Sequence, residues 1–284
     1  MKTIIALLLL AASASGAGEL VTQLPIGDPE RRDRSAAVVV DTVTDTRRDE
    51  RITVNQMVER LADTSLLFFG ENHTDMDFHR AQLQLISSLH RAGREVMIGL
   101  EMFPYTLQAE LDRWTAGDIS EAEFLDAADW YGSWGYRWEY YADIFRFARD
   151  EGLQMIGINA PRNVIKAVRT QGFDGLTEED LEHIPTTVDT SSDDHRRLYR
   201  AYFEDDDSIH MQLSDEQWEG MFRAQTTWDA VMGWNAALAV RRNGGPNTIM
   251  VVLIGAGHVT YGLGAERQIR ARYDGGIASV VPVQ

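Results

Sequence analysis

Two apolar runs of this sequence are each followed by a glycine, and a histidine lies three residues after each glycine. Residues 66–69 precede Gly70, Glu71 and His73, and residues 249–254 precede Gly255 and His258. A short apolar run that stops at a glycine predicts a buried strand followed by a turn. The sequence therefore places a Gly-x-x-His motif at the end of two predicted strands.

Polar side chains also follow two further apolar runs. Residues 96–100 end at Glu101, and residues 154–158 are followed by Asn159 and Arg162. In open parallel sheets the carboxyl ends of the strands lie at one edge, where ligands bind. We therefore expect these side chains to lie close to those of the paired motifs.

Two histidines and two carboxylates at one sheet edge support two kinds of chemistry. Glu71, His73, Glu101 and His258 are ligand types for a divalent metal such as Zn²⁺, Mn²⁺ or Fe²⁺. They are equally a metal-free acid and base set. Burial and like-charge proximity would then raise the pKa of one of the two glutamates.

Other candidate positions are less specific. Residues 130–141 hold seven Trp and Tyr side chains, a density that fits a core patch, a lid hinge or the lining of a pocket for a flat ligand. A helical histidine such as His79 more often lies at a surface or cap position, and we expect His90, His183 and His195 to be solvated. Thr260 stands where a dinucleotide-binding loop after Gly255 needs a third glycine, so that class is rejected.

Apolar strand patterns alternate with helical patterns along the chain. This alternation predicts an α/β fold with a mostly parallel central sheet and helices on both faces. Pro104 suits the first turn of a helix over 104–115, and residues 37–40 suit a short strand. Residues 176–242 include a strongly acidic stretch and are expected to form a helical excursion outside the sheet.

Composition limits the domain count and the partners. The chain has 284 residues, of which 44% are hydrophobic, and a formal net charge of −17. We expect a weakly ordered N-terminal arm over 18–50 and a single α/β domain over 51–284. The negative surface argues against nucleic acid and anionic lipid as partners.

Residues 1–17 have the order of regions that is typical of a signal peptide. A positive Lys2 precedes a short apolar stretch and then small residues. We therefore expect export to the periplasm or the medium, with no transmembrane segment. The absence of cysteine excludes disulfides, thiolate metal sites, a cysteine nucleophile and a cysteine for lipid anchoring.

The chain resembles the ChaN-like haem-binding lipoprotein family over about Ser65 to Tyr273. That family belongs to a superfamily with the Tiki proteases, the TraB/PrgY proteins and the erythromycin esterases. The resemblance rests on Gly70-Glu71-Asn72-His73 with His79, and on the segments 99–103, 130–141, 159–162, 224–229 and 255–262.

The resemblance implies an exported envelope protein that binds haem or a related tetrapyrrole and acts in haem or iron uptake. Haem iron is ligated through tyrosine or histidine, and its propionates suit arginine and histidine donors. A homodimer with haem between subunits is a further expectation. The ligand-binding residues expected on this basis are His73, His79, Tyr105, Asn159, Arg162, His258 and Tyr261.

The same superfamily contains hydrolases that use these glutamate and histidine positions. The alternative function is therefore a hydrolase, with or without a metal. Glu71 or Glu101 would activate water, and His73 and His258 would position it or carry protons. An envelope protein whose site has lost its chemistry is the third alternative.

Overall fold

The structure is a computed structural model. It describes residue 21 and residues 23–32, 34–204 and 213–283. The predicted signal peptide, 1–17, lies outside the described residues. Within the described residues no helix combines the length and the apolar character that crossing a bilayer requires.

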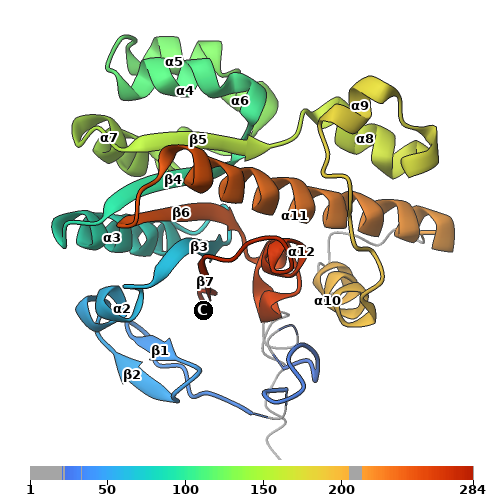
Figure 1. The fold of residues 1–284 in the computed structure, drawn as a ribbon, viewed down its shortest axis with the longest axis horizontal. Helices are drawn as coiled ribbons and strands as arrows, with labels where there is room; N and C mark the ends of the chain where they lie inside the picture. Colours follow the sequence, from blue (N-terminus) through green and yellow to red (C-terminus); the bar gives the residue numbers. More distant parts are fainter. Residues whose placement is uncertain (1–20, 22, 33, 205–212, 284) are drawn as a thin grey trace, which may run out of the picture.

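The centre of the fold is a parallel sheet of five strands (Figure 1). In spatial order they are β5 (Gln154–Asn159), β4 (Glu95–Pro104), β6 (Thr248–Gly255), β3 (Thr64–Glu71) and β7 (Gly276–Val280). Every neighbouring pair runs parallel. The predicted α/β class with a mostly parallel sheet is confirmed.

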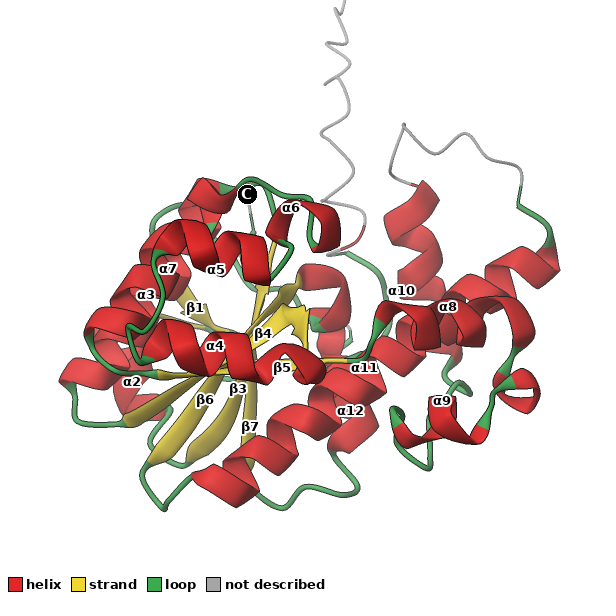
Figure 2. Ribbon diagram, turned by 90° about the horizontal axis from the view of Figure 1, so that it is seen from above, coloured by secondary structure: helices red, strands yellow, loops and turns green. Residues whose placement is uncertain are grey.

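Alternate side chains of each strand enter two separate hydrophobic cores, as a strand period of two requires. Leu67, Phe69 and Val251 lie in the core that contacts the helices of residues 54–150. Leu66 and Val252 lie in the opposite core, under the long helix that follows residue 214. The sheet is therefore covered on both faces (Figure 2).

The first core is closed by helices that come early in the chain. These are α2 (Val54–Arg60), α3 (Met76–Arg91), α4 (Gln108–Thr115), α5 (Glu121–Ala127), α6 (Trp130–Ser133) and α7 (Ala142–Asp150), with the 3-10 turns η1 (Tyr105–Leu107) and η2 (Trp138–Tyr140). Pro104 is the last residue of β4, and the helical structure predicted over 104–115 begins one residue later, as η1 and then α4. Strand β4 extends beyond residue 100 because residues 101–103 stay buried against the core.

The second face is covered by α11 (Asp215–Asn243) and α12 (Ala265–Ile269). Helices α8 (Arg162–Gln171), α9 (Glu178–Glu182) and α10 (Asp193–Glu204), with the turn η3 (Phe173–Gly175), gather around the first half of α11 (Figure 1). The predicted excursion over 176–242 therefore holds for α9 and α10. It fails for the second half of α11, which buries Met232 and Ala236 on the sheet.

Residues 37–40 form no strand. Val38 and Val40 are 56% and 81% exposed, because this apolar segment has no neighbouring strand to pair with. The strands near it are β1 (Val43–Asp45) and β2 (Glu50–Ile52), which form an antiparallel hairpin. The 3-10 turns η4 (Ala256–His258) and η5 (Thr260–Gly262) lie between β6 and α12.

Candidate functional site

The carboxyl ends of three adjacent strands bring the paired motifs together. Strands β3 and β6 pair so that Glu71 lies opposite Gly255, and β4 pairs on the other side of β6. Glu71, Glu101 and His258 are all buried, while the His73 side chain is 22% exposed. The sheet thus brings Glu71 and His73 to the same edge as Glu101 and His258.

Glu71 is the centre of one hydrogen-bond network. Its Oε1 accepts hydrogen bonds from the Tyr141 hydroxyl at 2.5 Å and from His73 Nδ1 at 2.8 Å. Its Oε2 accepts one from Gln82 Nε2 at 2.7 Å. Because Nδ1 of His73 is hydrogen-bonded to a carboxylate, Nε2 is the ring nitrogen that can interact with another group.

His258 lies between two carboxylates in a second network. Its Nε2 is 3.3 Å from Glu101 Oε1, and its Nδ1 donates to Asp229 Oδ1 at 2.7 Å. Asp229 comes from the middle of α11 and is fully buried. The other oxygen of Glu101 accepts the backbone amide of Gly255 at 2.6 Å.

The two networks meet at Gly255. A Cβ atom on this glycine would lie 3.2 Å from His73 Nε2 and 3.6 Å from Glu101 Oε2. Both groups therefore face the same small region above the end of β6. A glycine is needed there because any side chain would fill that region.

The charges of the second network stabilise one another. Burial alone would lower the pKa of His258, but Glu101 and Asp229 raise it to about 10. Burial would raise the pKa of Glu101, but His258 and His73 lower it to about 2. Glu101 is therefore ionised at neutral pH, and the predicted rise in a glutamate pKa is reversed at this residue because two imidazoles lie beside it.

Neighbouring charges also shift the pKa values of the first network. Burial lowers the pKa of His73, but its hydrogen bond to Glu71 and the charge of Glu101 outweigh this effect and raise it. Burial and the charge of Glu71 raise the pKa of Tyr141, which stays a hydrogen-bond donor. His73 and His258 are therefore both favoured as cations.

Two of the residues predicted to bind ligand have structural contacts instead. Both ring nitrogens of the buried His79 are used, Nδ1 at 3.2 Å from Gln82 Oε1 and Nε2 at 3.2 Å from the His73 carbonyl. The expectation of a surface or cap position for His79 is wrong. Asn159 donates to the Glu101 carbonyl and accepts from the amide of Ala160, both at 2.8 Å, so it fixes two strand ends.

The other predicted ligand residues lie apart from the buried networks. Tyr105 is 36% exposed, and its hydroxyl lies 2.5 Å from His183 Nδ1. Arg162 is exposed and contacts the Gly132 carbonyl at 3.4 Å. Tyr261 has a positive φ of 59° and packs in a small apolar cluster with Ile26.

The aromatic stretch 130–141 is mainly core. Trp130, Trp138 and Tyr141 are buried in the first hydrophobic core. Trp134 and Tyr136 pack on the His73 ring, with centroid distances of 4.8 Å and 4.9 Å. The stretch therefore supports His73 with rings on one side while Tyr141 holds Glu71.

Sequence reasoning missed Asp229, Gln82 and Tyr141 as members of the networks. A usable signal existed for Asp229, which is an acidic residue on the buried side of a largely apolar helix. His195 was expected to be solvated but is 1% exposed, because α10 packs it against α11.

Among the described residues, no group of three or more His, Asp or Glu side chains is arranged to hold a metal ion. In the predicted set, the His258 nitrogens and His73 Nδ1 already face carboxylate oxygens. The predicted metal site stays a prediction.

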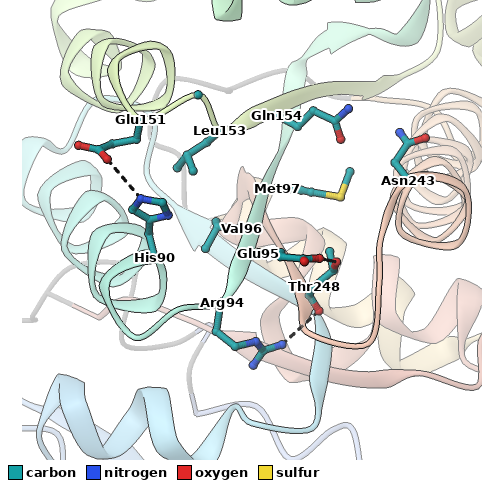
Figure 3. Close-up of a pocket in the computed structure, with 11 residues that line it drawn as sticks. His90, Arg94, Glu95, Val96, Met97, Glu151, Leu153, Gln154, Asn243 and Thr248 are labelled. Carbon is teal, nitrogen blue, oxygen red and sulfur yellow. Dashed lines mark hydrogen bonds and ion pairs between the residues drawn. The ribbon is translucent and has the colours of Figure 1, made fainter.

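A hollow of about 400 Å³ lies at the opposite edge of the sheet, where β4, β5 and β6 begin (Figure 3). Its lining mixes apolar side chains, such as Val96 and Leu153, with charged and polar ones, including the His90 and Glu151 pair at 3.2 Å. Arg94, in the same hollow, donates to five backbone carbonyls, those of Leu61, Ala62, Thr64, Asn247 and Thr248. These contacts tie the strand starts together.

The parallel sheet with helices on both faces makes this chain an α/β protein. Within that class, residues 57–269 match the model of the family described as haem-binding uptake, Tiki superfamily, ChaN. This match covers most of the chain, and the chain belongs to this family.

The structural comparison agrees on the fold. The structure of ChaN of Campylobacter jejuni with cofacial haem binding superposes with a TM-score of 0.68 at 16% identity, over 86% of this chain and 91% of that one. An erythromycin esterase variant in its open conformation gives a TM-score of 0.46 at 14% identity, over 79% of this chain and 71% of that one.

One curated protein matches part of the sequence. Protein RETICULATA-RELATED 5, chloroplastic, of Arabidopsis thaliana is 25% identical over 129 residues, which is 43% of this chain. The matched region spans only 17% of that protein's length.

Proposed function

We propose that this protein binds haem at an exposed site next to the ends of β4 and β5, with Tyr105 as the iron ligand. Membership of the haem-binding ChaN family supports the ligand class. The observation that carries the assignment to Tyr105 is that the residue is 36% exposed and its hydroxyl lies 2.5 Å from His183 Nδ1.

The buried histidines fit haem iron poorly. His258 has both ring nitrogens next to carboxylate oxygens, and those of His79 are also occupied. His73 Nε2 has no hydrogen bond to a protein atom of the described residues, but it lies close to Gly255, where an added Cβ would be 3.2 Å away. The Tyr105 hydroxyl also has a partner, His183, but Tyr105 is 36% exposed and can be reached from the surface.

The surroundings of Tyr105 suit a flat, dianionic ligand. Haem bound there would supply a ferric iron, and the phenolate oxygen of Tyr105 would be a suitable ligand to hold it. The Tyr105 hydroxyl lies 2.5 Å from His183 Nδ1. Burial and the charge of Glu182 raise the pKa of Tyr105, so iron binding would have to displace the phenol proton. Leu181, 49% exposed two residues before His183, provides apolar surface for the macrocycle. Arg162 follows β5 beside the end of β4 and can pair with a propionate.

Hemin titration of the purified protein tests this proposal. The wild type should show a saturable shift of the Soret band, and Tyr105→Phe should weaken binding at least tenfold and remove the tyrosinate charge-transfer band. Tyr131→Phe is the matched control, since Tyr131 is 60% exposed but has no histidine partner among the described contacts. Equal binding by wild type and Tyr105→Phe would exclude Tyr105 as the ligand.

We infer that the protein acts after export, as a homodimer when loaded with haem. The signal-like residues 1–17 support export. Tyr105 would hold the haem from one side. The other face of the haem would stay uncovered, so a second haem-loaded copy of the protein can pack against it. Light scattering with and without hemin should record a doubling of mass on loading; an unchanged mass would exclude the dimer.

The convergence of two networks at Gly255 favours a second candidate function, hydrolysis of an ester or amide. Glu101 orients a water whose oxygen bonds to the carbonyl carbon, and the water's proton passes to Glu101. His258, as a cation, gives a proton to the leaving group when the bond to it breaks. Activity against a panel of ester and amide substrates should be lost in His258→Gln. Activity that persists unchanged in this variant would exclude the site.

A further inference from the structure

His195 and Asp229 form a contact that none of the roles above uses. Asp229 Oδ1 accepts from His258, but Oδ2 has no hydrogen-bond partner although it is buried. Both ring nitrogens of His195 are likewise buried without a hydrogen bond. His195 Nε2 lies 3.4 Å from that same Oδ2. Unsatisfied polar atoms are rare in protein interiors, so two of them facing each other at one contact call for a reason.

We propose that His195 is a positioning residue: it holds Asp229, and through Asp229 it fixes the orientation of His258 for acid and base chemistry. The role rests on the second candidate function, because His258 is the acid of that reaction. The contact itself does not depend on catalysis.

The protonation state of His195 decides which group donates the hydrogen bond at the contact with Asp229. Burial lowers the pKa of His195, which is therefore neutral and carries one ring proton. With that proton on Nε2, the ring donates to Asp229 Oδ2. Asp229 then accepts two hydrogen bonds, one from each histidine. Glu101 also accepts two, from His258 and from the Gly255 amide. Every oxygen of both carboxylates is satisfied in this arrangement.

Packing holds His195 in place on several sides. Its ring lies edge-on to Phe222 of α11 at a centroid distance of 5.1 Å, and its backbone amide donates to Ser192 Oγ at 3.2 Å. The charged groups around it are Asp229 of α11, Arg267 of α12, His258 of η4 and Arg196 of its own helix. An imidazole fixed this closely restricts the rotation of the Asp229 carboxylate, which in turn fixes the His258 ring.

The first test needs no variant. Long-range nitrogen–proton correlation spectra of the wild type, labelled with ¹⁵N, report which ring nitrogen carries the proton. His195 is expected as a neutral ring with its proton on Nε2. A proton on Nδ1 instead would overturn the proposal, because Nε2 could then not donate to Asp229.

The second test compares two variants. His195→Gln keeps a donor at the position of Nε2, and His195→Phe keeps a planar ring without a donor. The downfield proton resonance of His258 Nδ1–H should persist in the wild type and in His195→Gln and be lost to exchange in His195→Phe. Circular dichroism establishes that each variant is folded. An unchanged resonance in folded His195→Phe, or its equal loss in folded His195→Gln, would overturn the positioning role.

The outcome is separable from the candidate reaction. A protein without hydrolytic activity can still give the expected spectra, in which case the second function fails and the contact stands. Where activity is found, His195→Phe should lower kcat at least tenfold with little change in KM, and His195→Gln should restore most of it.

Discussion

Single residues decide the charges at the sheet edge. Glu101 lies beside two imidazoles and receives a backbone amide, so it is ionised although buried. Its charge supports the cationic form of His258, because opposite charges in a buried site interact strongly. Removing one charge should therefore change the protonation of its neighbour.

Replacing Glu101 by Gln should lower the pKa of His258. The present value of about 10 depends on Glu101 and Asp229 together, and one of these charges is removed. NMR titration of the His258 ring measures the change, which is expected to exceed one pKa unit. Glu139→Gln, at an exposed glutamate, is the control and should leave the value in place. An unaltered His258 pKa in Glu101→Gln would contradict this account.

Replacing Gly255 by Ala should separate the two candidate functions. The added Cβ would lie 3.2 Å from His73 Nε2 and fill the region that His73 and Glu101 share. Hydrolysis should fall at least tenfold, whereas hemin affinity should stay within twofold because Tyr105 lies elsewhere. Gly257→Ala is the matched control, since its Cβ meets only the Tyr202 ring at 3.8 Å. Equal loss of hemin binding in Gly255→Ala would place haem at the buried networks.

At the scale of elements, helix α11 contributes more to the site than its sequence pattern indicated. It begins with a capping box formed by Ser214 and Gln217 and then carries Asp229 to the end of β6. Gly264, just before α12, allows the close contact between these segments. A Cβ there would lie 2.9 Å from Asp229 Oδ1 and would overlap the His258 carbonyl.

Replacing Gly264 by Ala should destabilise the protein by about 1–3 kcal/mol, the usual cost of overpacking a core. The His258 ring signals should shift as well, because the clash is with Asp229 and His258. Ser214→Ala is a useful comparison: loss of this cap should cost about 1 kcal/mol and leave those signals unchanged. Urea unfolding gives both free energies, and a neutral effect of Gly264→Ala would show that the contact can relax.

For the whole molecule, the Glu101 and His258 pair predicts how stability depends on pH. The pKa of Glu101 falls from 4.5 to about 2 on folding, so its contribution is complete above 4.5 and is lost as the pH falls toward 2. The pKa of His258 rises from 6.5 to about 10, so its contribution is complete below 6.5 and is lost as the pH rises toward 10.

The contribution of this pair to the free energy of unfolding should therefore be largest between about pH 4.5 and 6.5. Urea unfolding from pH 4 to 10 measures it. His258→Gln should lose most of the decline on the alkaline side that this histidine causes. The same alkaline slope in wild type and variant would show that His258 is not the group responsible.

Much of the fold was predictable because strand and helix periods are local properties. The apolar runs before Gly70, Glu101, Asn159 and Gly255 became four of the five parallel strands. The segment 37–40 was not predictable in this way, since an apolar run becomes a strand only when a partner edge is available. The second half of α11 was misplaced for a similar reason: its polar neighbours in sequence obscured which face meets the sheet.

The sequence by itself determined the class of the fold, the family and the meeting of Glu71, His73, Glu101 and His258 at one edge. Each of these follows from strand patterns and motif spacing, which depend on near neighbours in the chain. Only the tertiary structure decided the partners: Asp229 beside His258, His195 beside Asp229, and His183 beside Tyr105. These partners are 29 to 78 residues away from the groups that they contact, or belong to helices whose packing no local pattern specifies.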